Sequence, residues 1–343
     1  MATLDGVSER DDHPSTSGPG GSDRHDDAAD DGTADPNAGD TPDVRPVGFD
    51  NEFAFERLVG DPDVHEPVMI VQLDGWIDAA ESARIAADVI DHQCETSPIV
   101  RFDDDTYVDF RARRPILQLR DGLSTDLVWP SLELRAGTSP NGTDIVTLRG
   151  PEPDMAWHRF ARAITSLAKE LGVTQMVGLG AYPFAAPHTR PSHLSVSSPS
   201  TDVLASVPYL RSSVDVPAGA EALLEHAMHA AKIPAIGLWA QVPHYAATAD
   251  YPAAAVALLD GVARVGKVRV GTESLSEAAG IRTSELDDKI TDSPELAALL
   301  SSLEDVWDRT AAEAEMPDAD EELELRSGDE LAAEIQQFLR DRD

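Results

Sequence analysis

The middle of the chain alternates between apolar runs of strand length and longer segments with helical periodicity. The apolar run Pro67–Leu73 is followed by residues 79–92, in which Ile85, Val89 and Ile90 recur at helical spacing. The same alternation continues through Asp144–Arg149, Glu152–Leu171, Val173–Leu179, Leu194–Ser197, Ala218–Lys232, Pro234–Ala240 and Tyr251–Val265. Buried strands that alternate with helices pack as a largely parallel sheet covered on both faces. The sequence therefore predicts an α/β sandwich with a largely parallel sheet.

The segment between Ile99 and Arg135 departs from this alternation. It contains short strand patterns separated by turn signals, as in Arg114–Leu119. Such a segment is typical of antiparallel strands, which are often added to the edge of a parallel sheet. We therefore expect a mixed sheet.

The charge is distributed unevenly, and its distribution indicates the domains. Of the net charge of -36, residues 1–50 carry -10, residues 51–272 carry -10 and residues 273–343 carry -16. We predict a disordered acidic N-terminal arm over residues 1–48, because that segment has too few apolar side chains to offset its ordering entropy. An α/β core over residues 49–272 and an acidic helical C-terminal extension over residues 273–343 follow it.

Two helix starts and one apolar stripe mark the predicted extension. Ser293-Pro294 places an N-cap before a first-turn proline, and Ser327-Gly-Asp-Glu330 has the pattern of a capping box. An apolar stripe follows the first of these starts and must pack on the core, on a second copy or on a partner: Leu296, Leu299, Leu300, Leu303 and Trp307.

Composition excludes several classes of function. The acidity argues against nucleic acid and against anionic membrane surfaces, which both require a positive face. The sequence shows neither the hydrophobic region of a signal peptide nor an apolar run near the roughly 20 residues that span a bilayer. The single cysteine, Cys94, allows no intramolecular disulfide and no cysteine-based zinc cage. We expect a cytoplasmic protein.

Two turns lie where predicted strands end, which is the ligand side of an open α/β sheet. In Asp74-Gly75-Trp76-Ile77-Asp78, Gly75 permits a tight turn and Trp76 could close a pocket. Asp78 is interpreted as the cap of the next helix in preference to a ligand contact. Gly178-Leu-Gly180 lacks the rest of a dinucleotide fingerprint, which argues against such a site.

The densest polar cluster of the predicted core is His188-Thr-Arg190-Pro-Ser-His193. Arg190 would suit a carboxylate or phosphate ligand, although pairing with a local carboxylate, with the histidines capping backbone, is the favoured interpretation. We place the candidates for a ligand pocket at one rim of the sheet: Trp76, Tyr182, His188, Arg190, His193, His244 and Tyr245. We assign no catalytic residue, no metal and no cofactor.

Two acidic groups receive structural interpretations. Glu221 and Glu225 lie four residues apart on one predicted helix face, where like charges repel unless they are solvated, so we interpret both as surface residues. Asp103-Asp104-Asp105 lacks the glycine and the distal glutamate of a calcium loop and is interpreted as a turn. Nearby Arg111, Arg113 and Arg114 could pair with acids of the same or a neighbouring subunit.

A series of short motifs runs in order through the predicted core: Asp74–Trp76, Arg101–Pro115, Leu148–Asp154, Leu179–Pro183, Pro187–Pro191, Pro234–Tyr245 and Tyr251–Pro252. In these residues the chain resembles the actinobacterial branch of the PAC2 family, which is named after the proteasome assembly chaperone 2.

The resemblance implies a three-layer α/β/α sandwich, similar to the phosphorylase/hydrolase-like fold, with a helical C-terminal addition. It also implies homo-oligomers, with a trimer as one form, and a protein partner. The favoured function is a non-catalytic interaction protein, a chaperone-like factor linked to proteasome assembly or regulation. The alternative is a small-molecule-binding protein or enzyme on a nucleoside-phosphorylase-like scaffold. Catalysis is left open, and the sequence leans against it.

Overall fold

The centre of the sheet consists of four parallel strands. The computed structural model describes residues 48–75, 77–291 and 293–314. In it, β3 (Val68–Asp74) lies between β8 (Asp144–Pro151) and β9 (Gln175–Phe184), and β11 (Ala235–Pro243) lies beside β9. Successive side chains of β3 enter different cores, with Val68 and Ile70 in one and Met69 and Val71 in the other. This alternation explains why the strand is apolar on both faces.

Antiparallel strands extend the parallel centre on both sides. Within the described residues, nine strands form one sheet in the order β1-β2-β4-β7-β8-β3-β9-β11-β10. β7 is antiparallel to β8, and β10 is antiparallel to β11. The outer strands are β1 (Gly48–Asp50), β2 (Phe55–Arg57), β4 (Ser97–Phe102), β7 (Glu133–Thr138) and β10 (Leu194–Ser197). The predicted mixed sheet is confirmed.

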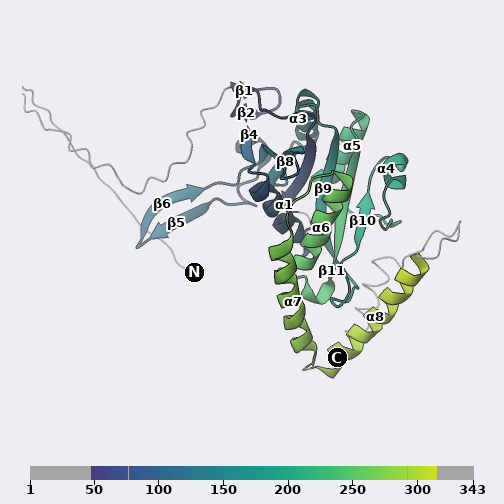
Figure 1. Cartoon of the computed structure of the whole chain (residues 1–343). Helices are drawn as coiled ribbons and strands as arrows, with labels where there is room; N and C mark the ends of the chain where they lie inside the picture. The colour runs from purple at the N-terminus through teal and green to yellow at the C-terminus, as the bar shows by residue number, and fades with distance from the viewer. Residues whose placement is uncertain (1–47, 76, 292, 315–343) are drawn as a thin grey trace, which may run out of the picture. The chain divides into compact units, whose positions relative to one another are not determined.

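Helices cover both faces of this sheet, as Figure 1 shows. α1 (Ser82–Gln93) and α6 (Pro252–Val265) contribute to one buried apolar cluster. α3 (Trp157–Glu170) and α5 (Ala220–Ala230) contribute to the other. The predicted three-layer α/β sandwich is confirmed. Shorter helices connect the layers: α2 (Asp104–Tyr107), α4 (Thr201–Ala205) and the 3-10 turns η1 (Ala79–Glu81) and η2 (His244–Ala246).

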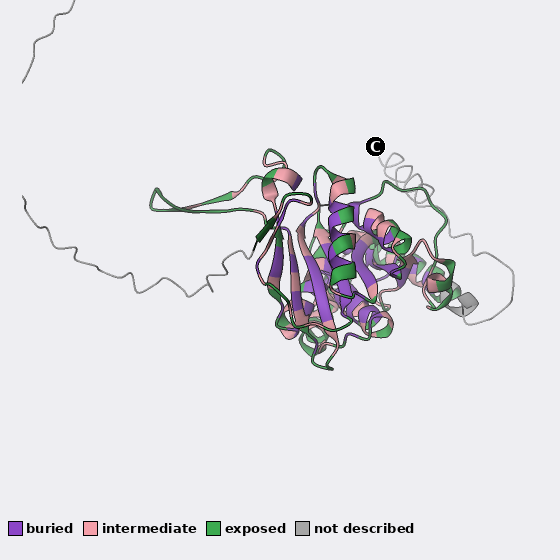
Figure 2. Ribbon diagram, turned by 90° about the horizontal axis from the view of Figure 1, so that it is seen from above, coloured by how far each residue is buried: buried purple, intermediate pink, exposed green. Residues whose placement is uncertain are grey.

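One hairpin leaves the sheet. β5 (Ile116–Arg120) and β6 (Leu123–Val128) pair with each other in a separate two-stranded sheet, which projects from the core in Figure 1 and is mostly exposed in Figure 2. The prediction that segment 99–135 joins the main sheet is right for β4 and β7 and wrong for this hairpin. Asp121 and Gly122 both have positive φ at its tip, as a tight two-residue hairpin turn requires.

The C-terminal extension begins with two long helices. α7 (Glu273–Thr291) packs on α6, and α8 (Pro294–Ala314) packs on α7. The predicted start of α8 is confirmed, since the Ser293 hydroxyl accepts the Leu296 N–H at 3.4 Å. Of the apolar stripe, Leu303 and Trp307 are each only 8% exposed and pack within the chain itself. The predicted capping box at Ser327 lies outside the described residues, as does nearly all of the predicted N-terminal arm, and the three domain boundaries stay predictions.

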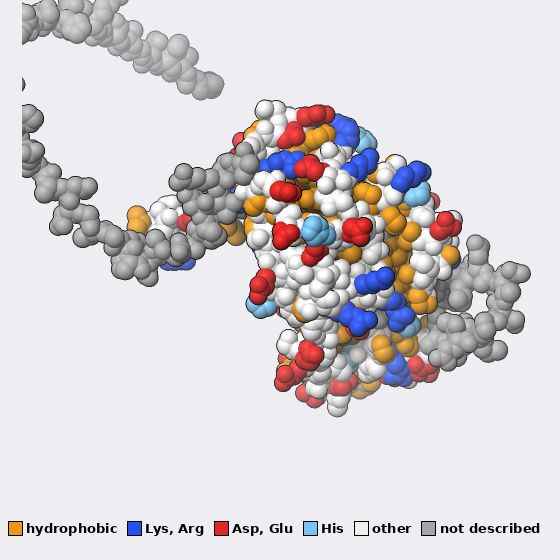
Figure 3. Space-filling model, turned by 45° about the horizontal axis from the view of Figure 1, so that its top comes forward, with side chains coloured by type: hydrophobic (Ala, Val, Ile, Leu, Met, Phe, Trp, Pro, Cys, Tyr) orange, Lys and Arg blue, Asp and Glu red, His pale blue; other side chains and the backbone are white. Residues whose placement is uncertain are grey.

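The surface of the core carries charges of both signs. On the face seen in Figure 3, acidic and basic side chains are interspersed, with apolar side chains between them. This mixture agrees with the modest net charge of residues 51–272. Across the described ranges, none of the helices has the length and apolarity that a bilayer crossing would require.

Candidate functional site

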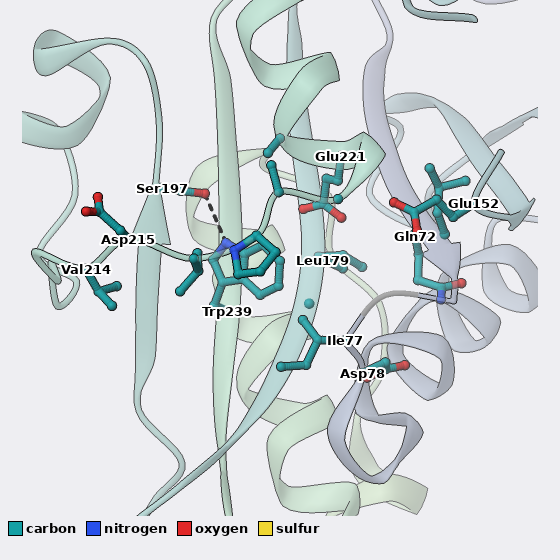
Figure 4. Close-up of a pocket in the computed structure, with 17 residues that line it drawn as sticks. Gln72, Ile77, Asp78, Glu152, Leu179, Ser197, Val214, Asp215, Glu221 and Trp239 are labelled. Atoms are coloured by element: carbon teal, nitrogen blue, oxygen red, sulfur yellow. Dashed lines mark hydrogen bonds between the residues drawn. The ribbon is translucent and has the colours of Figure 1, made fainter. Parts of the chain in front are cut away.

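A pocket of about 400 Å³ opens where the parallel strands end, beside the start of α5 (Figure 4). That end of an open α/β sheet is where ligands commonly bind. Its described lining comes from β3, β9, β10 and β11, from the residues that follow β3 and β8, and from the loop before α5 together with the first turn of α5. The lining residues are Gln72, Leu73, Ile77, Asp78, Glu152, Leu179, Gly180, Ser197, Val214, Asp215, Val216, Pro217, Ala218, Gly219, Glu221, Ala222 and Trp239.

Glu221 is the most unusual of these residues, because one oxygen of its carboxylate is buried without a donor. It is 9% exposed, and its Oε1 has no hydrogen-bond partner within the described part of the chain. Burial is the main cause that raises the pKa of Glu221 well above its usual range, and the charges of Glu225, Asp78 and Glu152 act in the same direction. The prediction that Glu221 is a surface residue is therefore wrong.

Glu225 lies one turn further along α5 and is 3% exposed, so its prediction as a surface residue is also wrong. The Ser197 hydroxyl donates to Glu225 Oε1 at 2.9 Å, and the Trp239 indole N–H donates to the same hydroxyl oxygen at 3.0 Å. Burial raises the pKa of Glu225 to about 7, against the lowering effect of the Ser197 hydrogen bond. A chain of hydrogen bonds thus links β11, β10 and α5 behind the pocket.

Glycines in the neighbouring strands make room for both glutamates. A side chain on Gly178 of β9 would collide with the Glu221 carboxylate, and one on Gly237 of β11 would lie 2.5 Å from Glu225 Oε1. Gly180 similarly accommodates the Trp239 ring. Glycine inside a strand often marks such a close approach. The strand glycines are the sequence signal that could have revealed the buried glutamates. A second signal is that both glutamates lie on the helix face that carries Met228.

Two further acids of the pocket, Asp78 and Glu152, accept hydrogen bonds from backbone N–H groups. Asp78 accepts the N–H groups of Ala83 and Arg84 at 2.8 and 2.9 Å, which confirms its interpretation as a helix cap. Asp78 nonetheless also lines the pocket, and burial raises its pKa. Glu152 accepts the N–H of Ala220 at the start of α5. These bonds satisfy helix N-termini, where carboxylates are favourable.

Six of the seven residues predicted from the sequence as ligand-pocket candidates lie away from this pocket. Trp76 falls outside the described residues. None of the other six lines the 400 Å³ pocket. Tyr182 is hydrogen-bonded within the sheet, where its hydroxyl lies 3.1 Å from Ser195 Oγ and accepts from Gln241 Nε2. His244 packs edge-on against the Tyr245 ring. Their binding of a ligand stays a prediction.

The other predicted candidates fasten the C-terminal helices to the core. His188 is 4% exposed, and its ring nitrogens lie 2.8 Å from the Tyr245 hydroxyl and 3.1 Å from Asp287 of α7. The Tyr245 hydroxyl oxygen also accepts the backbone N–H of His188. The resulting Tyr-His-Asp chain joins η2 to α7.

Arg190 and His193 bind α8 in the same way. Arg190 forms a two-pronged ion pair with Asp308, at 2.9 and 2.8 Å, and a further contact with Glu304. The interpretation that Arg190 pairs with a carboxylate is confirmed, although its partners lie more than 100 residues along the chain and not locally. The His193 ring stacks on Trp307 at 3.6 Å, and burial lowers the pKa of His193.

The acidic run near the arginines also has a structural role. Asp104 and Asp105 begin the short helix α2, where a turn was predicted, and burial raises the pKa of Asp104 to about 6. Arg113 does pair with an acid, Asp154, and also donates to the Asp74 carbonyl at 3.1 Å. Across the described ranges, no three His, Cys, Asp or Glu side chains are grouped closely enough to hold a metal ion.

Comparison with known proteins identifies similar chains. The model of the PAC2 family matches residues 72–290. A Mycobacterium tuberculosis protein of unknown function, Rv2714, is 33% identical with a TM-score of 0.72, and the match covers 79% of this chain and 94% of that one. A PAC2 family protein from Streptomyces avermitilis is 32% identical with a TM-score of 0.62, covering 68% and 99%.

A third similar structure carries a functional description. It is the Mycobacterium tuberculosis proteasome-assembly chaperone homologue Rv2125, which is 31% identical with a TM-score of 0.64. The match covers 68% of this chain and 99% of that one. No curated protein matches the chain.

Proposed function

Because this chain belongs to the PAC2 family, we propose that it is a non-catalytic interaction protein of the cytoplasm, a chaperone-like factor in proteasome assembly or regulation. The observation that carries this proposal is the 31% identity, over 68% of this chain, with a protein described as a proteasome-assembly chaperone homologue. Its partner would be a protein and not a nucleic acid, since the chain carries a net charge of -36.

The β5–β6 hairpin supports a protein-binding role. Both of its faces carry apolar side chains that water reaches, and Ile116 and Leu123 are each 68% exposed. An isolated two-stranded hairpin is marginally stable in water, and exposed apolar patches commonly mark protein interfaces. We propose that this hairpin contacts a second copy of the chain in a homo-oligomer, for which a trimer is the first assembly to test.

Affinity capture from the native host tests the proteasome link. The tagged full-length chain should recover proteasome subunits or their assembly intermediates after cross-linking. An unrelated protein with a similar sequence pI, about 4.4 for this chain, is the control, because a highly acidic bait captures basic proteins without specificity. Deletion of the gene should also change the ratio of unassembled to assembled subunits on native gels. Recovery of no subunit and an unchanged ratio would contradict the proposal.

The relatives do not favour the alternative function expected from the sequence, an enzyme or small-molecule binder on a phosphorylase-like scaffold. One of the three similar proteins is described as of unknown function, one by its family and one as a chaperone homologue. Fold alone does not establish an activity. We therefore make the interaction role the proposal, and treat the pocket beside α5 separately.

A further inference from the structure

The pocket beside α5 presents buried acceptor atoms that lack donors. Gln72 and Glu221 both line the pocket, and Oε1 of each residue has no hydrogen-bond partner within the described residues. Gln72 is 1% exposed and Glu221 is 9% exposed. Leaving a buried acceptor without a donor is unfavourable, because the acceptor has lost its hydrogen bonds to water. Two such acceptors at one pocket require donors from outside the described residues, supplied either by ordered water or by a ligand.

The orientation of Gln72 is set by its other amide atom. Its Nε2 donates to Asp74 Oδ1 at 3.0 Å, which leaves Oε1 as the acceptor without a partner. An amide oxygen cannot become a donor by taking up a proton at ordinary pH. The missing partner of Gln72 must therefore be a donor, whatever the protonation state of Glu221.

The charge of the pocket favours a cationic donor. All four charged residues in its described lining are acids: Asp78, Glu152, Asp215 and Glu221. Asp78 and Glu152 already accept backbone N–H groups, and Glu225 behind the pocket accepts the Ser197 hydroxyl. Glu221 has no such donor for its Oε1. Buried carboxylates are normally paired with a positive group.

The rest of the lining is largely apolar. Leu73, Ile77, Leu179, Val214 and Val216 contribute aliphatic surface, and the Trp239 indole contributes an aromatic ring. Figure 4 shows the Glu221 carboxylate between Trp239 and Gln72, above Leu179. A pocket with apolar walls and a few converging polar atoms is typical of small-molecule sites, and about 400 Å³ is within their usual size.

We propose that this pocket binds a small organic amine with an apolar body. Its ammonium group donates to Oε1 of Glu221 and Oε1 of Gln72, and its apolar body lies against Leu179 and Trp239. An aromatic ring near the ammonium adds a cation–π attraction. The proposal concerns a different surface from the β5–β6 hairpin and does not depend on the proteasome role.

Isothermal titration calorimetry of the full-length chain with phenethylamine tests the site. Phenethylamine combines an ammonium group with an apolar ring, and we expect a dissociation constant of about 1 mM or tighter. Phenethyl alcohol, which lacks the charge, should bind at least about tenfold more weakly, because its hydroxyl offers Glu221 a single neutral hydrogen bond in place of a charge-assisted one. Equal binding of the amine and the alcohol would overturn the proposal.

Two variants locate the binding. Glu221→Gln and Gln72→Met should each weaken phenethylamine binding by about tenfold or more, since each removes an acceptor oxygen or its charge. Glu277→Gln is the matched control, because it makes the same change of charge at an exposed position of α7. Thermal melting verifies that each variant folds. Unchanged affinity in a folded Glu221→Gln variant would refute the site.

Proton release distinguishes a direct contact from a merely structural role of Glu221. The titratable groups that raise the pKa of Glu221 are Glu225, Asp78 and Glu152, all acids. An ammonium group beside Glu221 lowers that pKa, so binding should release a proton. The calorimetric enthalpy at pH 7 should then depend on the buffer's ionisation enthalpy, and this dependence should vanish in Glu221→Gln. Tighter binding of 3-phenylpropionate, or Glu221-dependent binding of Mg²⁺ or Zn²⁺, would overturn the proposal.

Discussion

The carboxylate of Glu221 on α5 occupies the space beside Gly178 on β9 that a side chain there would need. The same relationship holds one strand away, where Glu225 lies against Gly237 of β11. A helix that carries two acids therefore packs closely on the sheet through two glycines. Both acids can be buried against the sheet because these strands have no side chain at the two positions.

Gly178→Ala should destabilise the fold through this contact. The new methyl group collides with Glu221, and crowding of this kind typically costs about 1–3 kcal/mol. Urea unfolding should show the loss, whereas Gly60→Ala, with nothing near its added methyl group, should not. In the double variant with Glu221→Ala, part of the loss should be recovered, with a coupling of about 0.5–3 kcal/mol. Strictly additive effects would mean that the two residues do not compete for the space.

Glu225 should make stability depend on pH. Its pKa is raised from 4.5 to about 7 in the folded chain, so the unfolded chain ionises first as the pH rises. Below pH 4.5 Glu225 contributes up to about 3 kcal/mol to the free energy of unfolding. This contribution is lost as the pH rises from about 4.5 to 7. Glu225→Gln should flatten this part of the profile, as measured by urea unfolding at pH 5 and 7.5. Glu277→Gln should leave the profile unchanged, and parallel curves for all three proteins would contradict the assignment.

Trp307→Ala should release α8 from the core. Trp307 stacks on His193 at 3.6 Å and is 8% exposed, and loss of a buried tryptophan costs about 3–5 kcal/mol. Amide hydrogen exchange in α8 should accelerate, while the sheet stays protected. Exposure of His193 should also raise its pKa, which NMR titration can follow. Asp305→Ala, at an exposed position of the same helix, should change neither observable.

Charges on the β5–β6 hairpin should dissociate the proposed homo-oligomer. Ile116→Glu with Leu123→Glu places two acids where apolar side chains are each 68% exposed. Light scattering should then give a smaller mass, with little change in melting temperature, because these side chains contribute little to the core. Ser124→Glu with Thr125→Glu adds the same charge at polar positions of the hairpin and serves as the control. An equal mass for all three proteins would remove the hairpin from the interface.

Much of the architecture was predictable because it depends on local patterns. Leu194–Ser197 was predicted as a strand and is β10, and the predicted helix over Tyr251–Val265 is α6 from Pro252 to Val265. Apolar periodicity and first-turn proline act within a few residues, so one chain segment contains the whole signal. The β5–β6 hairpin was harder to predict, because an alternating strand pattern does not indicate which sheet the strand will join.

The candidate site was predictable only in part. Asp78 was identified as a helix cap, and the structure confirms that role while also placing Asp78 at the pocket. Glu221 and Glu225 were assigned to the surface, because like charges four residues apart ordinarily require water. Their burial depends on Gly178 and Gly237, which lie on two other elements of the chain. A pattern within one helix carries no information about the strand opposite it.

The sequence by itself determined the alternation of strands and helices, the helix starts and the concentration of acidic charge at the two ends. These properties follow from propensity, periodicity and composition, which need no knowledge of distant residues. Only the tertiary structure decided that Arg190 forms an ion pair with Asp308 and that Glu221 Oε1 is buried at a pocket with no donor among the described residues. Those relationships join residues far apart in the chain, and they arise when the sheet and helices pack and water is excluded.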